Sequence, residues 1–355
     1  MANKLKLVLK IISINFFFIL LFIIIIELIF GNWFKSNNYG NLIIPRYQVK
    51  LINNPPYKTE KLGIYSRDKN GFRANTYNLS NINTLVVGGS TTEERYVDDQ
   101  LIWTKVLDNN LLNTEYEKVL NAGIGGQTSF GHIRIFDLWF SRFDDLKPKI
   151  ILFYIGINDA LYMLESIKKK QSTFKGRLVN DTDRDNLIHK SSSDQLIQYL
   201  KNNSVFRLFY KIIQGNIIAW KYKIKNKSKN SYLSKPKYIK DITQNVDVNS
   251  NDFENYTHIY KDNLSKLVIK SEEFNAIPVF ITQVVAKDHW LKNYVSKINS
   301  HTIEFCSNNK IVCINLADDI SIGNTVNFHD GIHTTPIGSK KIGDLIGYNL
   351  LKELN

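Results

Sequence analysis

Residues 84–92 read TLVVGGSTT, a short apolar run that stops at two glycines and a hydroxyl group. A β-branched run bounded by glycine is typical of a buried strand, and the glycines permit a sharp turn at its end. We therefore expect Ser90 on a turn that directly follows a buried strand. A Gly-Gly-Ser turn is also a common loop, so this stretch alone does not predict catalysis.

From residue 84 onward, the chain repeats this succession of strand, turn and helix. Further strands are expected at 118–121, 149–155, 277–282 and 311–316, and helices at about 99–112, 129–143, 254–275, 289–306 and 336–354. Strands that alternate with helices indicate a parallel sheet covered on both faces. The sequence thus predicts one α/β domain of about five strands over residues 84–355.

The pattern breaks down at about 161–252, which we interpret as an insertion between two units of this domain. Residues 196–220 have mixed helical periodicity and several large apolar side chains. They are expected to pack their apolar face on the domain, or else to form a lid or a helix on a membrane surface.

Polar or glycine motifs follow four of the expected strands. Ser90, Gly126 and Asn158 come after the first three strands, and Asp330 and His333 come after the last. In open parallel sheets, the loops at the carboxyl ends of the strands converge on one crevice. Motifs at four such loops therefore predict an active site there.

These residue types suit a serine nucleophile. The hydroxyl of Ser90 needs a base, which His333 provides, and Asp330 three residues earlier would orient the imidazole. The backbone N–H groups of Ser90 and Gly126 and the side-chain amide of Asn158 would stabilise the oxyanion.

Structural alternatives exist for these residues. Gly126 can serve only a turn, Asn158 can cap a helix, and His333 can bond to the backbone. His329 is a rival base, less favoured because Asp330 is less well placed to orient its ring.

Taken in order, four blocks resemble those of the SGNH, or GDSL-like, hydrolases. They are GGST at 88–91, the segment 121–128, GIND at 156–159 and DGIH at 330–333, and the resemblance covers the chain from about residue 85 less the insertion. It implies a three-layer, flavodoxin-like parallel sheet, a triad of Ser90, Asp330 and His333, and an oxyanion hole. Gly89 stands where many members have aspartate, which leaves the subfamily and substrate open.

Cofactors and metals are not expected. Residues 122–128 read AGIGGQT and lack the third glycine of a dinucleotide-binding loop, because Thr128 takes its place. Cys306 and Cys313 are either a disulfide in an oxidising compartment or two small buried side chains, and their spacing does not suggest a metal site.

The N-terminal region predicts a membrane anchor. Residues 11–30 are apolar except for three positions, which is long enough to cross the hydrocarbon layer. Three lysines precede this run, and no small-residue cleavage site follows it. We expect an uncleaved single span within residues 1–35 in the inner (cytoplasmic) membrane, a stem and lead-in at 36–83, and a periplasmic or extracellular catalytic domain.

A formal net charge of +13 could indicate nucleic-acid binding, but lysine is abundant throughout the chain. For an exported domain, anionic glycans or lipid headgroups are more natural neighbours, and no nucleic-acid partner is expected. Our leading hypothesis is an esterase that removes O-acetyl or similar groups from a surface polysaccharide. The alternatives are an O-acyltransferase, a non-catalytic glycan-binding or assembly protein, and a lipase or thioesterase.

Overall fold

The computed structural model describes residues 2–31, 44, 48–52, 55–57, 63–168, 204–206, 210, 247, 250–319 and 321–354. The chain divides into two compact units. One comprises Met1–Asn41 and Asp183–Tyr232, and the other comprises Leu42–Thr182 and Leu233–Asn355.

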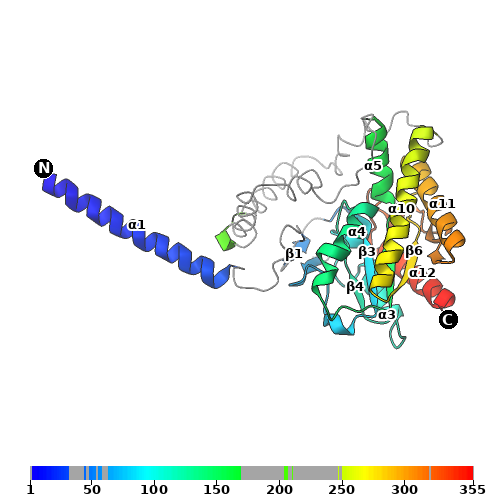
Figure 1. Ribbon diagram of the computed structural model, residues 1–355, viewed down its shortest axis with the longest axis horizontal. Coiled ribbons are helices and arrows are strands. Elements are labelled where there is room, and N and C mark those ends of the chain that lie inside the picture. The colour runs from blue at the N-terminus through cyan, green and yellow to red at the C-terminus, as the bar shows by residue number, and fades with distance from the viewer. Residues whose placement is uncertain are drawn as a thin grey trace. The chain divides into compact units, whose positions relative to one another are not determined.

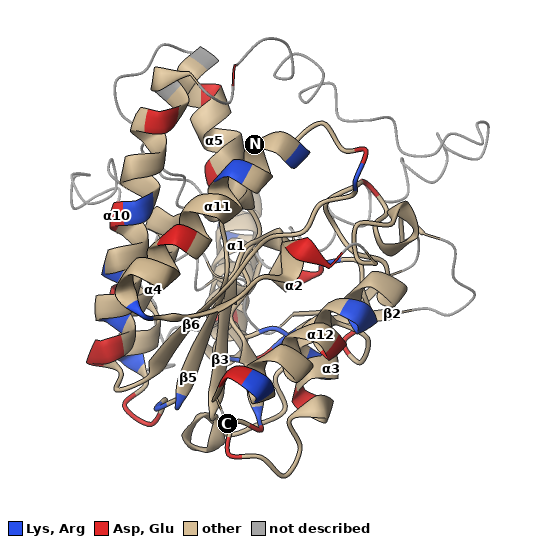
Figure 2. Cartoon of the chain, turned by 90° about the vertical axis from the view of Figure 1, so that its right-hand side faces the viewer, with Lys and Arg blue, Asp and Glu red and all other residues tan. Residues whose placement is uncertain are grey.

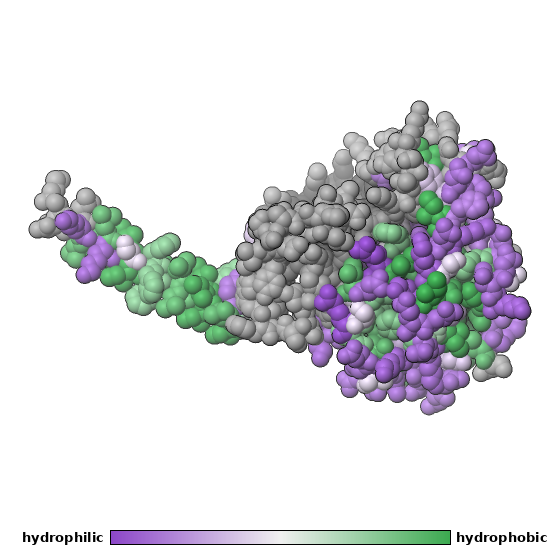
Figure 3. Space-filling view, viewed as in Figure 1, coloured by the Kyte–Doolittle hydropathy of each residue, from purple (hydrophilic) through white to green (hydrophobic). Residues whose placement is uncertain are grey.

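The first unit contains helix α1 (Ala2–Phe30). Its segment Lys6–Phe30 has a mean hydropathy of 2.8 and contains no buried residue, and Figure 3 shows a mostly apolar surface. By length and composition this helix can cross a membrane, and a signal sequence has the same properties. Glu27 near its end accepts hydrogen bonds from the hydroxyl of Ser204 at 2.5 Å and the N–H of Val205 at 2.9 Å. The expected helical stretch 196–220 otherwise lies almost entirely outside the described residues.

The second unit is built on a five-stranded parallel sheet in the order β4-β3-β5-β6-β7. The strands are β3 (Thr84–Gly88), β4 (Val119–Asn121), β5 (Ile150–Tyr154), β6 (Ile277–Ile281) and β7 (Val312–Ile314). The order reverses at β3, whose neighbours β4 and β5 follow it in sequence, and this is the flavodoxin-like order. The switch point therefore lies at the carboxyl end of β3, directly before Ser90.

Helices cover both faces of the sheet (Figures 1 and 2). One layer contains α4 (Ser129–Leu138), α5 (Ile157–Lys168), α10 (Asn251–Glu273) and α11 (Lys292–Asn309), and the other contains α3 (Trp103–Asn110) and α12 (Pro336–Leu354). Every residue of β3 and β5 is buried, as expected for central parallel strands. The three-layer α/β architecture is confirmed.

The core differs between the two faces of the sheet. On one face, Val86 and Leu152 pack with Trp103 of α3 and Ile342 of α12 in a single apolar cluster. On the other face aromatic rings meet, with Phe153 stacked on Phe280 at 5.0 Å between ring centroids. The alternation along each strand follows from the period-two placement of side chains.

Several boundaries differ from the expected ones. The helix expected at 99–112 begins only at Trp103, because residues 98–102 form turns held by the carboxylate of Asp98. The helix expected at 129–143 ends at Leu138, and a 3-10 turn, η2 (Phe140–Arg142), follows. Helix α5 continues to Lys168, so the regular structure extends beyond the expected start of the insertion.

The lead-in also contains regular structure that the pattern did not predict. β1 (Gln48–Ile52) and β2 (Gly63–Arg67) form an antiparallel pair. The remaining short elements are α2 (Ser90–Glu93) and the 3-10 turns η1 (Leu79–Asn81), η3 (Leu316–Asp318) and η4 (Thr325–Asn327). Cys306 and Cys313 are both free thiols, the first of them buried.

Candidate active site

Ser90 lies at the first position of a short helix that follows β3 without a loop. The carbonyl of Gly89 accepts hydrogen bonds from the N–H groups of Thr92 at 3.1 Å and Glu93 at 2.9 Å, and the carbonyl of Ser90 accepts from Glu94 at 3.0 Å. This tight turn fixes the backbone of Ser90 and leaves its side chain half-buried at the edge of the sheet.

His333 comes from the loop after β7 and contacts Ser90 directly. Its Nε2 atom lies 2.8 Å from Oγ of Ser90, and its Nδ1 atom lies 2.7 Å from Oδ2 of Asp330. The other oxygen of Asp330 accepts hydrogen bonds from the N–H groups of Ile332 at 3.0 Å and His333 at 2.8 Å. The carboxylate is therefore fixed by the turn that carries the imidazole.

The electrostatics of this turn keep Asp330 ionised. Burial alone would raise the pKa of its carboxyl, but the side-chain and backbone hydrogen bonds from His333, together with the imidazole charge, hold that pKa well below its usual range. An ionised carboxylate at this position accepts from Nδ1–H and stabilises a positive charge on the ring.

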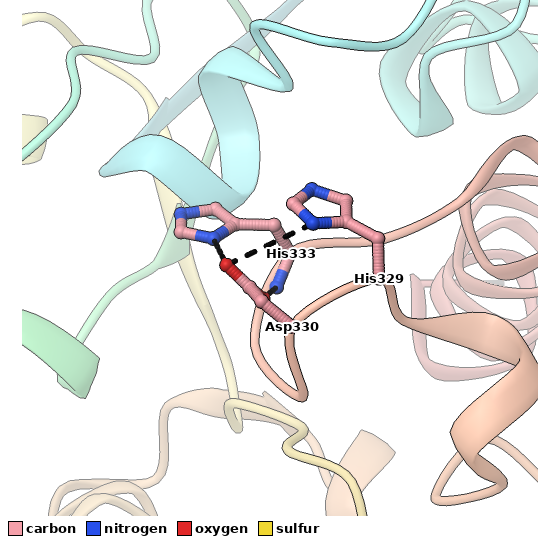
Figure 4. A group of neighbouring side chains, drawn as sticks. All are labelled: His329, Asp330 and His333. Carbon is pink, nitrogen blue, oxygen red and sulfur yellow. Dashed lines mark hydrogen bonds and ion pairs between the residues drawn. The ribbon is translucent and has the colours of Figure 1, made fainter. Parts of the chain in front are cut away.

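His329 lies beside this pair and faces the same carboxylate oxygen from a greater distance (Figure 4). Its ring stacks on that of His333 at 5.6 Å between centroids, and its Nδ1 atom lies 3.8 Å from Oδ2 of Asp330. Burial lowers the pKa of His329 to about 4, so this imidazole is neutral at pH 7. The geometry favours His333 over His329 as the base.

One set of atoms in this loop could also hold a metal ion. One ligand atom from each of His329, Asp330 and His333 lies within 4.8 Å of the others. Two imidazole nitrogens and a carboxylate oxygen are ligands that suit Zn²⁺. The same carboxylate and imidazole form the pair next to Ser90, so a metal here would compete with that hydrogen bond.

The residues expected in the oxyanion hole occupy two different environments. Gly126 has a φ of +81° and lines the same cavity as Ser90. Asn158 at the start of α5 is buried, and its side-chain amide donates to the carbonyl of Gln127 at 2.8 Å. Asn158 thus joins the third sequence block to the second, and its role as an oxyanion donor stays a prediction.

The cavity next to Ser90 has a volume of about 390 Å³. Its walls come from the nucleophile turn, from the loop after β4 and from the loop of His333, and its lining residues are Ser90, Glu93, Glu94, Arg95, Tyr96, Val97, Gly125, Gly126, His329, His333 and Thr334. The structure therefore brings Ser90, Gly126 and His333 together at one cavity, with Asp330 behind the imidazole.

Glu93, to which the sequence analysis gave no role, holds the second block against the nucleophile turn. Its buried carboxylate accepts from the hydroxyl of Tyr65 at 2.8 Å and the N–H of Gly125 at 2.9 Å, and it pairs with Arg67 at 3.2 Å. Burial opposes ionisation, but the charges of Arg67 and Arg95 and the hydrogen bonds lower the pKa of Glu93. This network positions Gly125, the neighbour of Gly126.

Glu94 connects the nucleophile turn to the loop of the base. Its fully buried carboxylate accepts from the N–H of Trp103 at 2.6 Å and from the hydroxyls of Thr334 and Ser339. Burial raises the pKa of Glu94 to about 7 in spite of these hydrogen bonds. Because Thr334 directly follows His333, Glu94 fixes the base relative to the nucleophile.

Arg73 is a third residue whose role the sequence did not reveal. Its buried guanidinium donates to the carbonyls of Glu93 at 3.0 Å and Val97 at 2.8 Å, and it forms an ion pair with Asp99. The sequence feature that could have indicated such buried ion pairs is the run of three charged residues, Glu93 to Arg95, directly after a buried strand and its turn. Charges in such a place need buried partners.

Several solved structures match this chain at low sequence identity. The psychrotrophic esterase EstA from Pseudoalteromonas sp. is 15% identical, with a TM-score of 0.42, and the match covers 77% of this chain and 99% of that one. A member of the lipolytic protein G-D-S-L family from Veillonella parvula is 12% identical, with a TM-score of 0.42 and coverage of 77% and 98%. The acetyl xylan esterase AlAXEase is 11% identical, with a TM-score of 0.42 and coverage of 75% and 99%.

Searches with the sequence find no matching protein-family model and no matching curated protein. The fold is evident from the strand order β4-β3-β5-β6-β7 and from the helices on both faces of the sheet. The four sequence blocks follow the strands of this sheet. This chain has the fold that its resemblance to the SGNH (GDSL-like) hydrolases implies.

Proposed function

We propose that this protein is a serine esterase that removes O-acyl groups, O-acetyl in the simplest case, from a cell-surface polysaccharide. The observation that carries the proposal is the continuous contact from Ser90 to Asp330. Oγ of Ser90 lies 2.8 Å from Nε2 of His333, whose Nδ1 lies 2.7 Å from Asp330, and Ser90 and His333 border an open cavity.

In the proposed reaction, Oγ of Ser90 attacks the ester carbonyl while Nε2 of His333 takes its proton. Asp330 stabilises the imidazolium that forms. The backbone N–H groups of Ser90 and Gly126 and the amide of Asn158 are the proposed donors to the oxyanion. The imidazolium then protonates the departing sugar hydroxyl, leaving an acyl group on Ser90, and a water molecule activated by His333 releases the acid.

The polysaccharide substrate and the location are supported by features outside the triad. Helix α1 has the length and composition of a membrane span, so we propose a single-pass anchor that holds the esterase at the outer face of the inner membrane. A cavity of about 390 Å³ suits a small acyl group and part of a sugar. A periplasmic reporter fused after Asn355 should be active, and an inactive reporter would contradict this orientation.

The full-length protein in detergent tests the esterase proposal. We expect acetate release from p-nitrophenyl acetate and from an acetylated polysaccharide, and loss of both in Ser90→Ala. The matched control is Ser141→Ala, because Ser141 is exposed, does not line the cavity and donates to the carbonyl of Asp137 in α4. A fluorophosphonate should label the wild type and the control but not Ser90→Ala.

The outcomes separate the competing functions. Hydrolysis that survives in Ser90→Ala would overturn the proposal. Fluorophosphonate labelling of Ser90 without release of acetate, but with transfer of acetyl to an added sugar, would identify an O-acyltransferase. A folded protein that binds glycan with neither labelling nor turnover would be a binding protein.

A further inference from the structure

A cation that the proposed mechanism does not use lies beside the nucleophile. The side chain of Arg95 is 64% exposed and lines the cavity with Ser90 and His333. A β-carbon placed on Gly125 would lie 3.7 Å from Nη2 of Arg95 and also 3.7 Å from Cβ of Ser90. The guanidinium of Arg95 and the side chain of Ser90 therefore both border the space in front of Gly125.

The acidic neighbour of Arg95, Glu93, is shared with a second guanidinium group. Nη2 of Arg95 lies 3.4 Å from both carboxylate oxygens of Glu93, which is a long contact. Glu93 already pairs with the buried Arg67 at 3.2 Å and accepts from Tyr65 and Gly125. The carboxylate of Glu93 thus faces two guanidinium groups. The exposed guanidinium, that of Arg95, has further N–H donors that a ligand can reach.

A second cation adds to the same side of the site. Lys50 on β1 is exposed, and its Nζ lies 5.7 Å from the centre of the Tyr65 ring. Partial desolvation of its ammonium group, followed by repulsion from Arg95 and Arg67, lowers the pKa of Lys50. Asp99, another acid near this cluster, is already paired with Arg73.

We infer that Arg95 binds a carboxylate of the substrate close to the ester, so that the preferred substrate is an O-acylated acidic glycan such as a polyuronate. The inference rests on the proposed function and specifies its substrate class. The planar guanidinium fork matches a carboxylate with two parallel hydrogen bonds. Arg95 is exposed, so it can reach a carboxylate on the sugar that carries the acyl group or on the next one. Positive potential at the rim also steers an anionic polymer toward Ser90.

The test compares acidic and neutral esters with the full-length protein. The substrates are O-acetylated polygalacturonate, acetylated xylan and p-nitrophenyl acetate, with an O-acetylated sugar phosphate to distinguish phosphate from carboxylate recognition. The variants are Arg95→Gln, which removes the charge, and Arg95→Lys, which keeps the charge without the fork. Arg142→Gln is the matched control, since Arg142 is also exposed and is not part of the cavity.

We expect Arg95→Gln to lower kcat/KM for acetylated polygalacturonate by about tenfold, mainly through KM, because a charge-assisted pair is lost. The losses on xylan and p-nitrophenyl acetate should be several-fold smaller than the loss on the acidic polymer, since these esters offer no partner to the guanidinium. Arg95→Lys should recover part of the loss, and added salt should weaken the preference of the wild type for the acidic polymer.

Equal losses on all esters, or no loss on the acidic one, would overturn the inference while leaving the esterase intact. A loss confined to the sugar phosphate would overturn the carboxylate assignment. If the wild type hydrolyses none of these esters, the proposed function fails. In that case, binding of acetylated polygalacturonate is measured with Ser90→Ala and with the double variant that also carries Arg95→Gln. Weaker binding by the double variant would support the inference, and equal binding would overturn it.

Discussion

The side-chain amide nitrogen of Asn158 lies 2.6 Å from the position that a β-carbon on Gly89 would occupy. Real β-carbons do not approach other atoms so closely, and the amide is held in place by the carbonyl of Gln127 at 2.8 Å. The residue before the nucleophile must therefore be glycine unless Asn158 moves.

Gly89→Ala should consequently impair catalysis by displacing Asn158. If the amide stabilises the oxyanion, we expect kcat for p-nitrophenyl acetate to fall by about 10²–10³-fold in Gly89→Ala and in Asn158→Ala. The double variant should be little worse than either single variant, because both act on one contact. Full activity in Asn158→Ala would show that the amide has no catalytic role.

Glu94→Gln should loosen the link between the nucleophile turn and the loop of His333. We expect kcat to fall by about tenfold, because small displacements of a catalytic group are costly. Fluorophosphonate labelling of Ser90 should slow in parallel, and circular dichroism should show that the fold is kept. An unchanged kcat would mean that Thr334 and Ser339 hold the loop without this carboxylate.

The same substitution should change the dependence of stability on pH. The pKa of Glu94 is raised by burial to about 7, so between its ordinary value and pH 7 the folded state binds more protons than the unfolded state. The contribution of Glu94 to stability is therefore present at low pH and is lost as the pH rises through about 4.5 to 7, by ~3 kcal/mol at most. Urea unfolding at pH 5 and pH 8 should show a smaller difference in Glu94→Gln than in the wild type. An identical difference would contradict the burial of an ionisable carboxyl here.

Asp330→Asn should keep the position of the loop but remove the charge that faces His333. We expect kcat to fall by about 10²–10⁴-fold with KM nearly unchanged, because the imidazolium formed during attack loses its partner. The stability due to this carboxylate should also disappear. Since the pKa of Asp330 is lowered in the folded state, that contribution exists above the ordinary aspartate range and is lost at lower pH. A variant with wild-type kcat would exclude Asp330 from the triad.

Zinc should inhibit the esterase reversibly. The ligand atoms of His329, Asp330 and His333 lie within 4.8 Å of one another, and coordination of Asp330 would break its hydrogen bond to the base. We expect inhibition by micromolar Zn²⁺, relief by EDTA, and about a tenfold higher inhibiting concentration for His329→Gln. If EDTA instead abolishes the activity of the wild type, the cluster is a working metal site.

The parts of the fold that depend on local pattern could be predicted from the sequence. The apolar run before Ser90 is buried on both faces in the structure, and the closing helix runs from Pro336 to Leu354 as its spacing indicated. The contact of Asp330 with His333 is also local, because three residues of a turn suffice to form it. Such features involve neighbours in the chain, so their signal is present in a short window.

The parts that depend on distant partners could not be predicted. Glu94 contacts Thr334 across 240 residues, and nothing in the local sequence of either residue indicates the pairing. The pairing of β1 with β2 could not be predicted because β1 shows no alternation of buried and exposed residues, with only Ile52 buried. The steric demand of Asn158 on Gly89 likewise arises only after α5 is placed beside β3.

Ser90 and His333 are separated by 243 residues, yet their side chains touch. During synthesis, the ribosome releases the nucleophile long before the base, and the intervening chain must add β4, β5, β6 and β7 to the sheet before the two can meet. A nascent chain therefore carries a serine without its activating partner. Labelling of Ser90 by a fluorophosphonate would accordingly report when a newly synthesised chain has completed its fold.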